Sequence, residues 1–282
     1  MPVCYRHSSR ETGVSCSSCG RPICPDCMTP TSVGMRCPEC SREKTKVRTA
    51  RHIQRATEPV VTYTLIAVNV IAYLAEGTSG SALTSNGVSG SLLTKGLLYG
   101  PDITVKHQYY RLLTSGFIHL SFQHILFNMV FVFFLGRMLE PAIGRLNFAA
   151  VYLASLLAGS FGALLLSPDI PSAGASGAAF GLLGAAIAVA YDRHIPIWSS
   201  GLGITLVINI VFSLAVPNIS IGAHIGGLIG GLICGWAIVK MGERRGQKWA
   251  ALAVCALVAV ASVAGGIAVA GQPGLIPGGL TF

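Results

Sequence analysis

The chain has 282 residues, of which 52% are hydrophobic and only 11% are charged, and its formal net charge is +9. An ordinary soluble domain is about 25% charged, so this composition excludes a purely soluble globular protein. The positive charge does not indicate a nucleic-acid partner, because the basic residues cluster beside apolar runs, where orientation in a bilayer explains them.

Residues 1–41 hold seven of the nine cysteines, and these form short pairs with one histidine. Two residues separate the members of each pair: Cys4 and His7, Cys16 and Cys19, Cys24 and Cys27, Cys37 and Cys40. This is the ligand spacing of structural zinc sites, and eight ligands predict two tetrahedral ions. A disulfide framework is the alternative, which a reducing cytoplasm disfavours. So small a domain has little core and is expected to fold only with metal.

A basic linker toward anionic lipid is predicted over residues 42–58. Its basic residues are Arg42, Lys44, Lys46, Arg48, Arg51 and Arg55. We expect the zinc-binding domain before it to bind a protein partner or to regulate the rest of the chain. No signal peptide is recognised ahead of the first apolar run, so the first membrane segment is expected to act as its own insertion signal.

The rest of the chain is expected to be an all-α polytopic membrane protein. Crossing a bilayer takes about 20 apolar residues per helix, and seven runs come near that length: 60–76, 121–138, 146–166, 175–191, 198–216, 219–240 and 249–271. We divide this part into a membrane core over 59–240 and an additional helix and tail over 241–282. The segment 77–110 is too polar to span, and is predicted to be a loop on or partly in the membrane surface.

The distribution of basic residues predicts how the helices are oriented. If the N-terminus is cytoplasmic, 17 Lys and Arg lie on the inner side and 3 on the outer side. The positive-inside rule therefore favours a cytoplasmic N-terminus and an outer C-terminus. The second, fourth and sixth helices would then all begin on the outer side, where polar residues at their starts can meet.

The location that goes with this orientation is the plasma membrane of the cell. Residues on the outer side would then meet the extracellular medium, and the metal-binding region would lie in the cytoplasm.

Residues 171–180 form a turn rich in glycine, alanine and serine that runs directly into an apolar helix, with Ser176 in its first turn. A helix start carries unpaired N–H groups and partial positive charge, so an oxyanion beside Ser176 would meet preorganised donors. The alternative is a plain N-cap serine in a small-residue packing motif. Because Ala178 stands at the second glycine position, this is not the Gly-x-Ser-x-Gly elbow of soluble hydrolases.

His224 opens the sixth helix on the same side and can supply the base that a serine nucleophile needs. A lone intramembrane histidine could instead be a proton relay or a packing residue. Phe180 lies one turn after Ser176, where it could support the imidazole or be an ordinary core aromatic. We expect no acidic residue inside the predicted spans, and Asp169 in an outer loop is the nearest one. The sequence therefore predicts a Ser–His dyad without a carboxylate member.

Small residues also predict close packing of the fourth and sixth helices. Three glycines follow one helix face and three follow the other: Gly177, Gly181 and Gly184, and Gly222, Gly226 and Gly230. Spacings of three and four keep small residues on one face and allow backbones to approach in lipid. Generic helix packing would leave the same pattern, and it is compatible with the dyad.

His124 and Asn128 are the candidate oxyanion-hole residues, because they project together one helical turn apart at the start of the second helix. His119 is interpreted as a structural hydrogen-bonding residue. Other membrane protease classes are excluded, since the chain has no His-Glu-x-x-His zinc motif and no pair of aspartates within the spans.

Residues 60–240 resemble the rhomboid family of intramembrane serine proteases. The motifs that carry the resemblance are Gly174-Ala175-Ser176-Gly177, Ala223-His224 followed by Gly227, His119-x4-His124-x3-Asn128, and Glu140 with Gly144. The resemblance implies a six-helix core with a hydrated site below the outer surface, and cleavage of transmembrane substrates. It also implies that Ser176 is the nucleophile, His224 the base, and His124, Asn128 and the Ser176 N–H the oxyanion hole.

Two positions depart from the family pattern, and two further segments resemble known modules. Tyr110-Arg111 replaces a Trp-Arg pair and Ser115 replaces a histidine, which puts loop anchoring in doubt. The run 249–271 resembles the extra C-terminal helix of the six-plus-one form. Residues 1–41 are similar to the B-box zinc finger, which suggests cross-braced pairing, with sequential pairing as the alternative.

A non-catalytic rhomboid-like adaptor that binds transmembrane clients is the second functional hypothesis.

Overall fold

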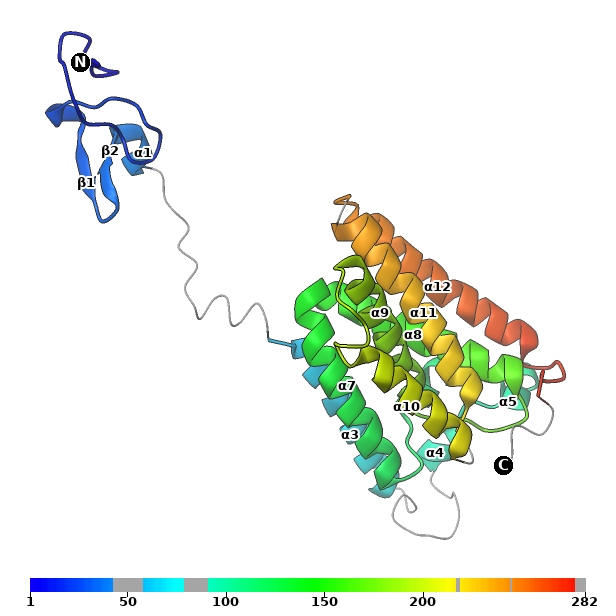
Figure 1. The fold of residues 1–282 in the computed structure, drawn as a ribbon. Helices are drawn as coiled ribbons and strands as arrows, with labels where there is room; N and C mark the ends of the chain where they lie inside the picture. Colours follow the sequence, from blue (N-terminus) through cyan, green and yellow to red (C-terminus); the bar gives the residue numbers. More distant parts are fainter. Residues whose placement is uncertain (43–57, 79–90, 217–218, 244, 277–282) are drawn as a thin grey trace. The chain divides into compact units, whose positions relative to one another are not determined.

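A computed structural model describes residues 1–42, 58–78, 91–216, 219–243 and 245–276. The chain divides into two compact units, Met1–Arg55 and Ala56–Phe282, which Figure 1 draws in sequence colours. The boundary between the units falls within the predicted linker 42–58. Apart from its two ends, that linker lies outside the described residues.

The N-terminal unit is built from short elements around its cysteines. They are η1 (Pro25–Cys27), β1 (Thr29–Thr31), β2 (Gly34–Arg36) and α1 (Pro38–Arg42), with β1 and β2 paired antiparallel. Ile23 is fully buried, and it is the one residue in the buried cluster of this unit that is not a cysteine. Apolar burial alone is therefore a small source of stability for this unit.

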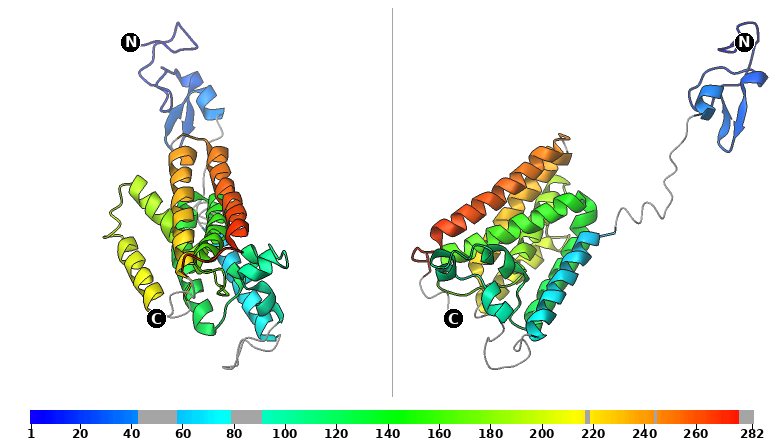
Figure 2. Two further views of the ribbon diagram at one scale, coloured as in Figure 1. Left: turned by 90° about the vertical axis from the view of Figure 1, so that its right-hand side faces the viewer. Right: turned by 180° about the vertical axis from the view of Figure 1, so that it is seen from behind.

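The second unit is a helical bundle, and each of the seven predicted runs forms a helix, as Figures 1 and 2 show. The helices are α3 (Val60–Thr78), α7 (Phe122–Ile143), α8 (Arg145–Leu166), α9 (Ser176–Asp192), α10 (Leu202–Ala215), α11 (Ile221–Ala237) and α12 (Lys248–Val269). A π-helical segment, η3 (Ile238–Glu243), extends α11. The prediction of a polytopic helical membrane protein with a small cysteine-rich N-terminal domain is confirmed.

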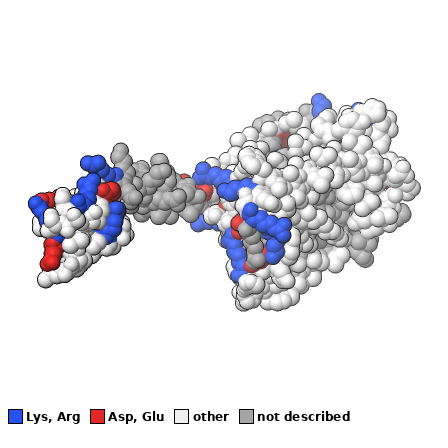
Figure 3. Space-filling view, turned by 90° about the horizontal axis from the view of Figure 1, so that it is seen from above, with Lys and Arg blue, Asp and Glu red and all other residues white. Residues whose placement is uncertain are grey.

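Length and composition suit four of these helices to crossing a bilayer: α7, α8, α12, and α11 together with η3. The other three, α3, α9 and α10, are apolar but shorter. In the view of Figure 3, Lys, Arg, Asp and Glu gather on one part of the bundle and most of its remaining visible surface carries none of them. Fourteen of the seventeen residues of α9 are buried, so α9 lies inside the bundle, packed against α8 and α11.

The region after α3 is more ordered than the predicted loop 77–110, although residues 79–90 lie outside the described residues. It contains α4 (Ser91–Gly96) and α5 (Gly100–Thr104), followed by α6 (Arg111–Thr114) and η2 (Ser115–Phe117). The buried Arg111 guanidinium pairs with Asp102 at 2.8 Å and donates to the carbonyl oxygens of Thr94 and Leu97 at 2.9 and 2.6 Å. Arg111 therefore anchors this region, while the neighbouring Tyr110 is exposed.

Buried acidic residues lie within three of the helices, contrary to the expectation that the spans contain none. Glu76, Glu140 and Asp192 fall inside α3, α7 and α9, because these helices extend to or beyond the ends of the apolar runs. The Glu140 carboxylate accepts hydrogen bonds from the N–H groups of Val61 and Thr62 at 2.9 and 2.7 Å. It thereby caps the start of α3, where a carboxylate is favoured by unpaired donors and by the helix dipole.

Close contact between α9 and α11 depends on glycines on both helices. A Cβ atom at Gly227 would lie 1.9 Å from the carbonyl oxygen of Gly177, and one at Gly231 would lie 1.9 Å from the carbonyl oxygen of Gly181. These distances leave no room for any side chain, so the two backbones are in direct van der Waals contact. Such contact lets dispersion forces hold helices together where lipid removes the hydrophobic drive.

The second glycine row of α11 faces a different helix from the one predicted. A Cβ atom at Gly222 would lie 2.2 Å from the carbonyl oxygen of Gly162 in α8, and one at Gly226 would lie 2.3 Å from that of Ala158. Gly230 also faces Ala158. The prediction that this row contacts α9 is therefore wrong, because successive residues turn by about 100° around a helix and the two rows lie on different faces.

We predict that Gly231→Ala destabilises the bundle by about 1–3 kcal/mol, because its methyl group would overlap the Gly181 carbonyl oxygen. Gly242→Ala is the matched control, since its Cβ would meet Ala251 at an ordinary 3.5 Å. Thermal unfolding of the purified protein in detergent measures the difference. Equal melting temperatures for the two variants would contradict the packing argument.

Candidate active site and metal clusters

Ser176 is the first residue of α9 and follows a loop that a glycine shapes. The N-cap position belongs to Ala175, so Ser176 is not the N-cap serine of the alternative interpretation. Gly174 has a φ of 119°, a conformation that side chains disfavour. Ser176 is half-buried. Because it is in the first turn of α9, the backbone N–H groups next to it in the sequence have no partner within the helix.

His224 lies in the first turn of α11, and its buried imidazole stacks on the ring of Phe180. The ring centroids are 4.1 Å apart and the planes differ by 13°. Phe180 is one helical turn beyond Ser176 on α9. A Cβ atom at Gly177 would lie 3.2 Å from the carbonyl oxygen of Ala223. The residues next to Ser176 and His224 in the sequence therefore touch, and the starts of α9 and α11 lie side by side.

Helix α10 contributes a second contact to the His224 imidazole, at its ring nitrogen Nδ1. The hydroxyl oxygen of Ser213 lies 2.6 Å from His224 Nδ1 and 2.6 Å from the carbonyl oxygen of Asn209. Sequence analysis did not single out Ser213. A serine that bonds the carbonyl four residues earlier is common in apolar helices, so the sequence alone carries no signal for this contact.

His124 and Asn128 of α7 lie against the loop that precedes Ser176. A Cβ atom at Gly174 would lie 2.5 Å from His124 Nε2 and 3.5 Å from Asn128 Nδ2. Asn128 is buried, and its Nδ2 has no hydrogen-bond partner among the described residues. A buried amide donor without a partner is unfavourable unless it meets an acceptor at some stage of the protein's action.

His119 is fully buried and packs edge-on against the ring of His124, with centroids 5.1 Å apart. Within the described part of the chain, neither of its ring nitrogens has a hydrogen-bond partner. The contact described for His119 is this ring contact, and its hydrogen-bonding role stays a prediction.

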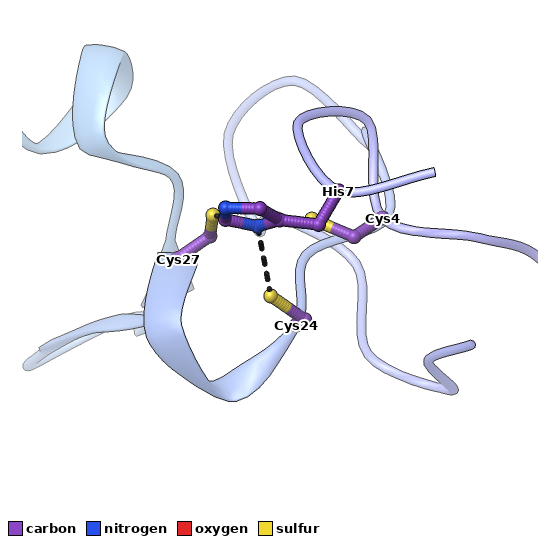
Figure 4. A group of neighbouring side chains, drawn as sticks. All are labelled: Cys4, His7, Cys24 and Cys27. Carbon is purple, nitrogen blue, oxygen red and sulfur yellow. Dashed lines mark hydrogen bonds between the residues drawn. The ribbon is translucent and has the colours of Figure 1, made fainter. Parts of the chain in front are cut away.

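The first cysteine cluster joins the first and third ligand pairs, as Figure 4 shows. His7 Nδ1 faces three sulfur atoms, at 3.8 Å from Cys4, 3.3 Å from Cys24 and 3.4 Å from Cys27. All four ligand atoms lie within 4.8 Å of one another. Three thiols and one imidazole nitrogen at this separation could hold a metal ion.

The second cluster joins the remaining two pairs, Cys16 with Cys19 and Cys37 with Cys40. The pairing is therefore the cross-braced one and not the sequential one. The Cys37 N–H donates to Cys16 Sγ at 3.2 Å. Arg21 Nε donates to Cys19 Sγ at 3.2 Å, and this hydrogen bond holds the pKa of the Cys19 thiol below its ordinary value. Both bonds favour the thiolate form that binds metal.

Comparison with known proteins agrees with this fold. The Rhomboid domain family matches residues 106–241. Rhomboid protease GluP of Bacillus subtilis (strain 168) is 34% identical over 175 residues, which are 61% of this chain and 33% of that protein. Putative rhomboid protease YdcA of the same organism is 33% identical over 142 residues, which are 49% of this chain and 71% of that protein.

Inactive RHOMBOID-like protein 8 of Arabidopsis thaliana is 31% identical over 130 residues, which are 44% of this chain and 37% of that protein. The matched region thus spans about a third of GluP and of the Arabidopsis protein, and more than two thirds of YdcA. The helical bundle and these matches define an integral membrane protein. The chain belongs to the rhomboid family.

Proposed function

We propose that this protein is an intramembrane serine endopeptidase in which Ser176 is the nucleophile and His224 the general base. The observation that carries the proposal is the stacking of the His224 imidazole on Phe180, one turn from Ser176, where α9 and α11 begin side by side. In this mechanism His224 takes the proton of the Ser176 hydroxyl as its oxygen attacks the scissile carbonyl. The imidazolium then gives that proton to the leaving amine, and water hydrolyses the acyl-enzyme.

Negative charge on the attacked carbonyl oxygen would be stabilised by the Ser176 N–H and by the side chains of Asn128 and His124. The unpartnered Asn128 Nδ2 supports this role, since it is a buried donor placed beside the loop that leads into Ser176. Donors that are already in place when charge develops require no reorganisation during the reaction.

The proposed substrates are transmembrane segments of other proteins. A helix of 17 residues is about 26 Å long, which is less than the roughly 30 Å of a hydrocarbon core. The short α9 therefore supports a site recessed below the membrane surface, where Ser176 would meet an unwound part of a membrane helix. A helical peptide bond is shielded by its own turn, so helix-breaking Gly or Pro in a substrate would lower the energy needed to expose it.

We predict that Ser176→Ala and His224→Ala abolish cleavage of a transmembrane reporter in liposomes, and that Asn128→Ala lowers kcat about 100-fold. His194→Ala is the control, because His194 is exposed in the loop after α9. Gel analysis of reporter fragments, with folding checked by thermal unfolding, measures the outcome.

Equal products from the wild type, Ser176→Ala and His224→Ala would remove this mechanism. No product from the wild type with any reporter, together with retained binding of the reporter, would favour the non-catalytic adaptor. The relative that is named an inactive rhomboid-like protein gives that alternative its weight.

We also propose that the N-terminus is cytoplasmic, that the C-terminus is outside, and that the membrane is the plasma membrane. The excess of Lys and Arg on one set of connecting segments supports this orientation. An epitope tag after Phe282 should then bind antibody on intact cells, and a tag before Met1 should bind only after permeabilisation. The reverse pattern would overturn the orientation.

We propose that each of the two cysteine clusters holds a structural zinc ion. One cluster offers three thiolates and an imidazole and the other four thiolates, which are donor sets that zinc prefers in closed tetrahedral sites. The nearly all-cysteine core of this unit supports the proposal, because metal binding would supply the folding energy that apolar burial does not. The folded unit is proposed to bind a protein partner.

Elemental analysis of the purified full chain should find about two zinc ions per protein. Cys24→Ala and Cys37→Ala, which each break one cluster, should leave about one ion, and the double variant should leave none. Cys255→Ala is the control, since Cys255 lies in α12 outside both clusters. A wild-type chain without zinc, or single variants that keep two ions, would refute the proposal.

A further inference from the structure

The hydroxyl of Ser213 is the one polar group that α10 places in contact with the candidate base. Only three residues of α10 are buried, and they are Leu202, Gly203 and Ser213. Ser213 Oγ lies 2.6 Å from His224 Nδ1 and 2.6 Å from the carbonyl oxygen of Asn209. Both distances are those of short, well-formed hydrogen bonds.

Counting protons leaves two arrangements for these two bonds. A carbonyl oxygen can only accept, and a serine hydroxyl has a single proton to give. In the first arrangement the proton of Ser213 goes to the Asn209 carbonyl oxygen, and Ser213 Oγ accepts a proton from His224 Nδ1. The opposite arrangement would turn the hydroxyl proton away from the carbonyl and place the imidazole proton on Nε2.

We propose that Ser213 is a positioning residue that holds His224 in the tautomer with its proton on Nδ1. This proposal rests on the proposed serine endopeptidase function. The hydrogen bond made by one ring nitrogen determines which nitrogen is protonated, so Nε2 keeps a free lone pair. Ser213 thus takes the place that an acidic residue occupies in a Ser-His-Asp triad, without a charge of its own.

The proton balance of the reaction follows from this assignment. His224 Nε2 takes the Ser176 proton as the bond from Oγ to the substrate carbonyl carbon forms. The same proton passes to the leaving nitrogen as the scissile C–N bond breaks. The Nδ1 proton stays on the ring throughout, and its bond to Ser213 Oγ becomes charge-assisted while the imidazolium exists.

Kinetics of reporter cleavage in liposomes test the role of the hydroxyl. Ser213→Ala should lower kcat about tenfold to a hundredfold with KM unchanged. Ser213→Thr should restore most of kcat, because its hydroxyl can also bond the carbonyl four residues earlier. Thr205→Ala is the matched control, since it removes a hydroxyl from the same helix away from His224. A wild-type kcat for Ser213→Ala, or a loss that threonine does not restore, would overturn the proposal.

Nitrogen NMR of histidine-labelled protein tests the tautomer without any turnover. In the Ser176→Ala background, His224 should carry its proton on Nδ1, and adding Ser213→Ala should shift it toward the Nε2 form. The His224 signal is identified by its loss in Ser176→Ala/His224→Gln. A proton on Nε2 in the Ser176→Ala protein would refute the role of Ser213 whether or not the wild type cleaves a reporter. Absence of wild-type cleavage with the Nδ1 form present would count against the proposed function alone.

Discussion

The contact between the backbones of α9 and α11 is the constraint on which the rest of the bundle depends. The helices meet where no side chain intervenes, with Gly227 and Gly231 against the carbonyl oxygens of Gly177 and Gly181. Lipid offers no hydrophobic force to drive such an association, so tight packing has to supply it. The same contact fixes the relative depth of the two helix starts, and with it the separation of the candidate nucleophile and base.

Two polar side chains inside the bundle bond groups of neighbouring helices. Glu140 of α7 satisfies the first N–H groups of α3, and Ser213 of α10 bonds the imidazole that α11 carries. A polar group in a water-poor interior is unfavourable unless it has a partner. Several buried polar atoms of the described bundle lack such a partner, and the amide nitrogen of Asn128 is one of them. A catalytic role would explain it, because its acceptor would be present only while a substrate reacts.

Much of the architecture could be predicted from the sequence, because its signals are local. Apolar runs predicted the seven helices, and Cys and His pairs with two residues between their members predicted the two cysteine clusters. Helix ends were harder, since Glu140 and Asp192 lie in turns that continue past the apolar runs. A run marks the lipid-facing length, whereas a helix continues for as long as its backbone is hydrogen-bonded.

Contacts between distant segments were the least predictable. The glycine row from Gly222 was assigned to the wrong neighbour, because spacing defines a face but does not say which helix covers it. Ser213 was missed for a related reason, since its contact with His224 depends on how α10 sits in the bundle. His124 and Asn128 were easier, because one helical turn alone brings them together.

In the described part of the N-terminal unit, Ile23 is the one member of the buried hydrophobic cluster that is not a potential ligand. If the two clusters hold metal as proposed, the folded state of this unit would depend on the supply of the ion, and that of the bundle on its lipid surroundings. Under that proposal a chelator would unfold the first unit and a harsh detergent the second, so a cell short of the ion would lose one unit of the polypeptide and keep the other.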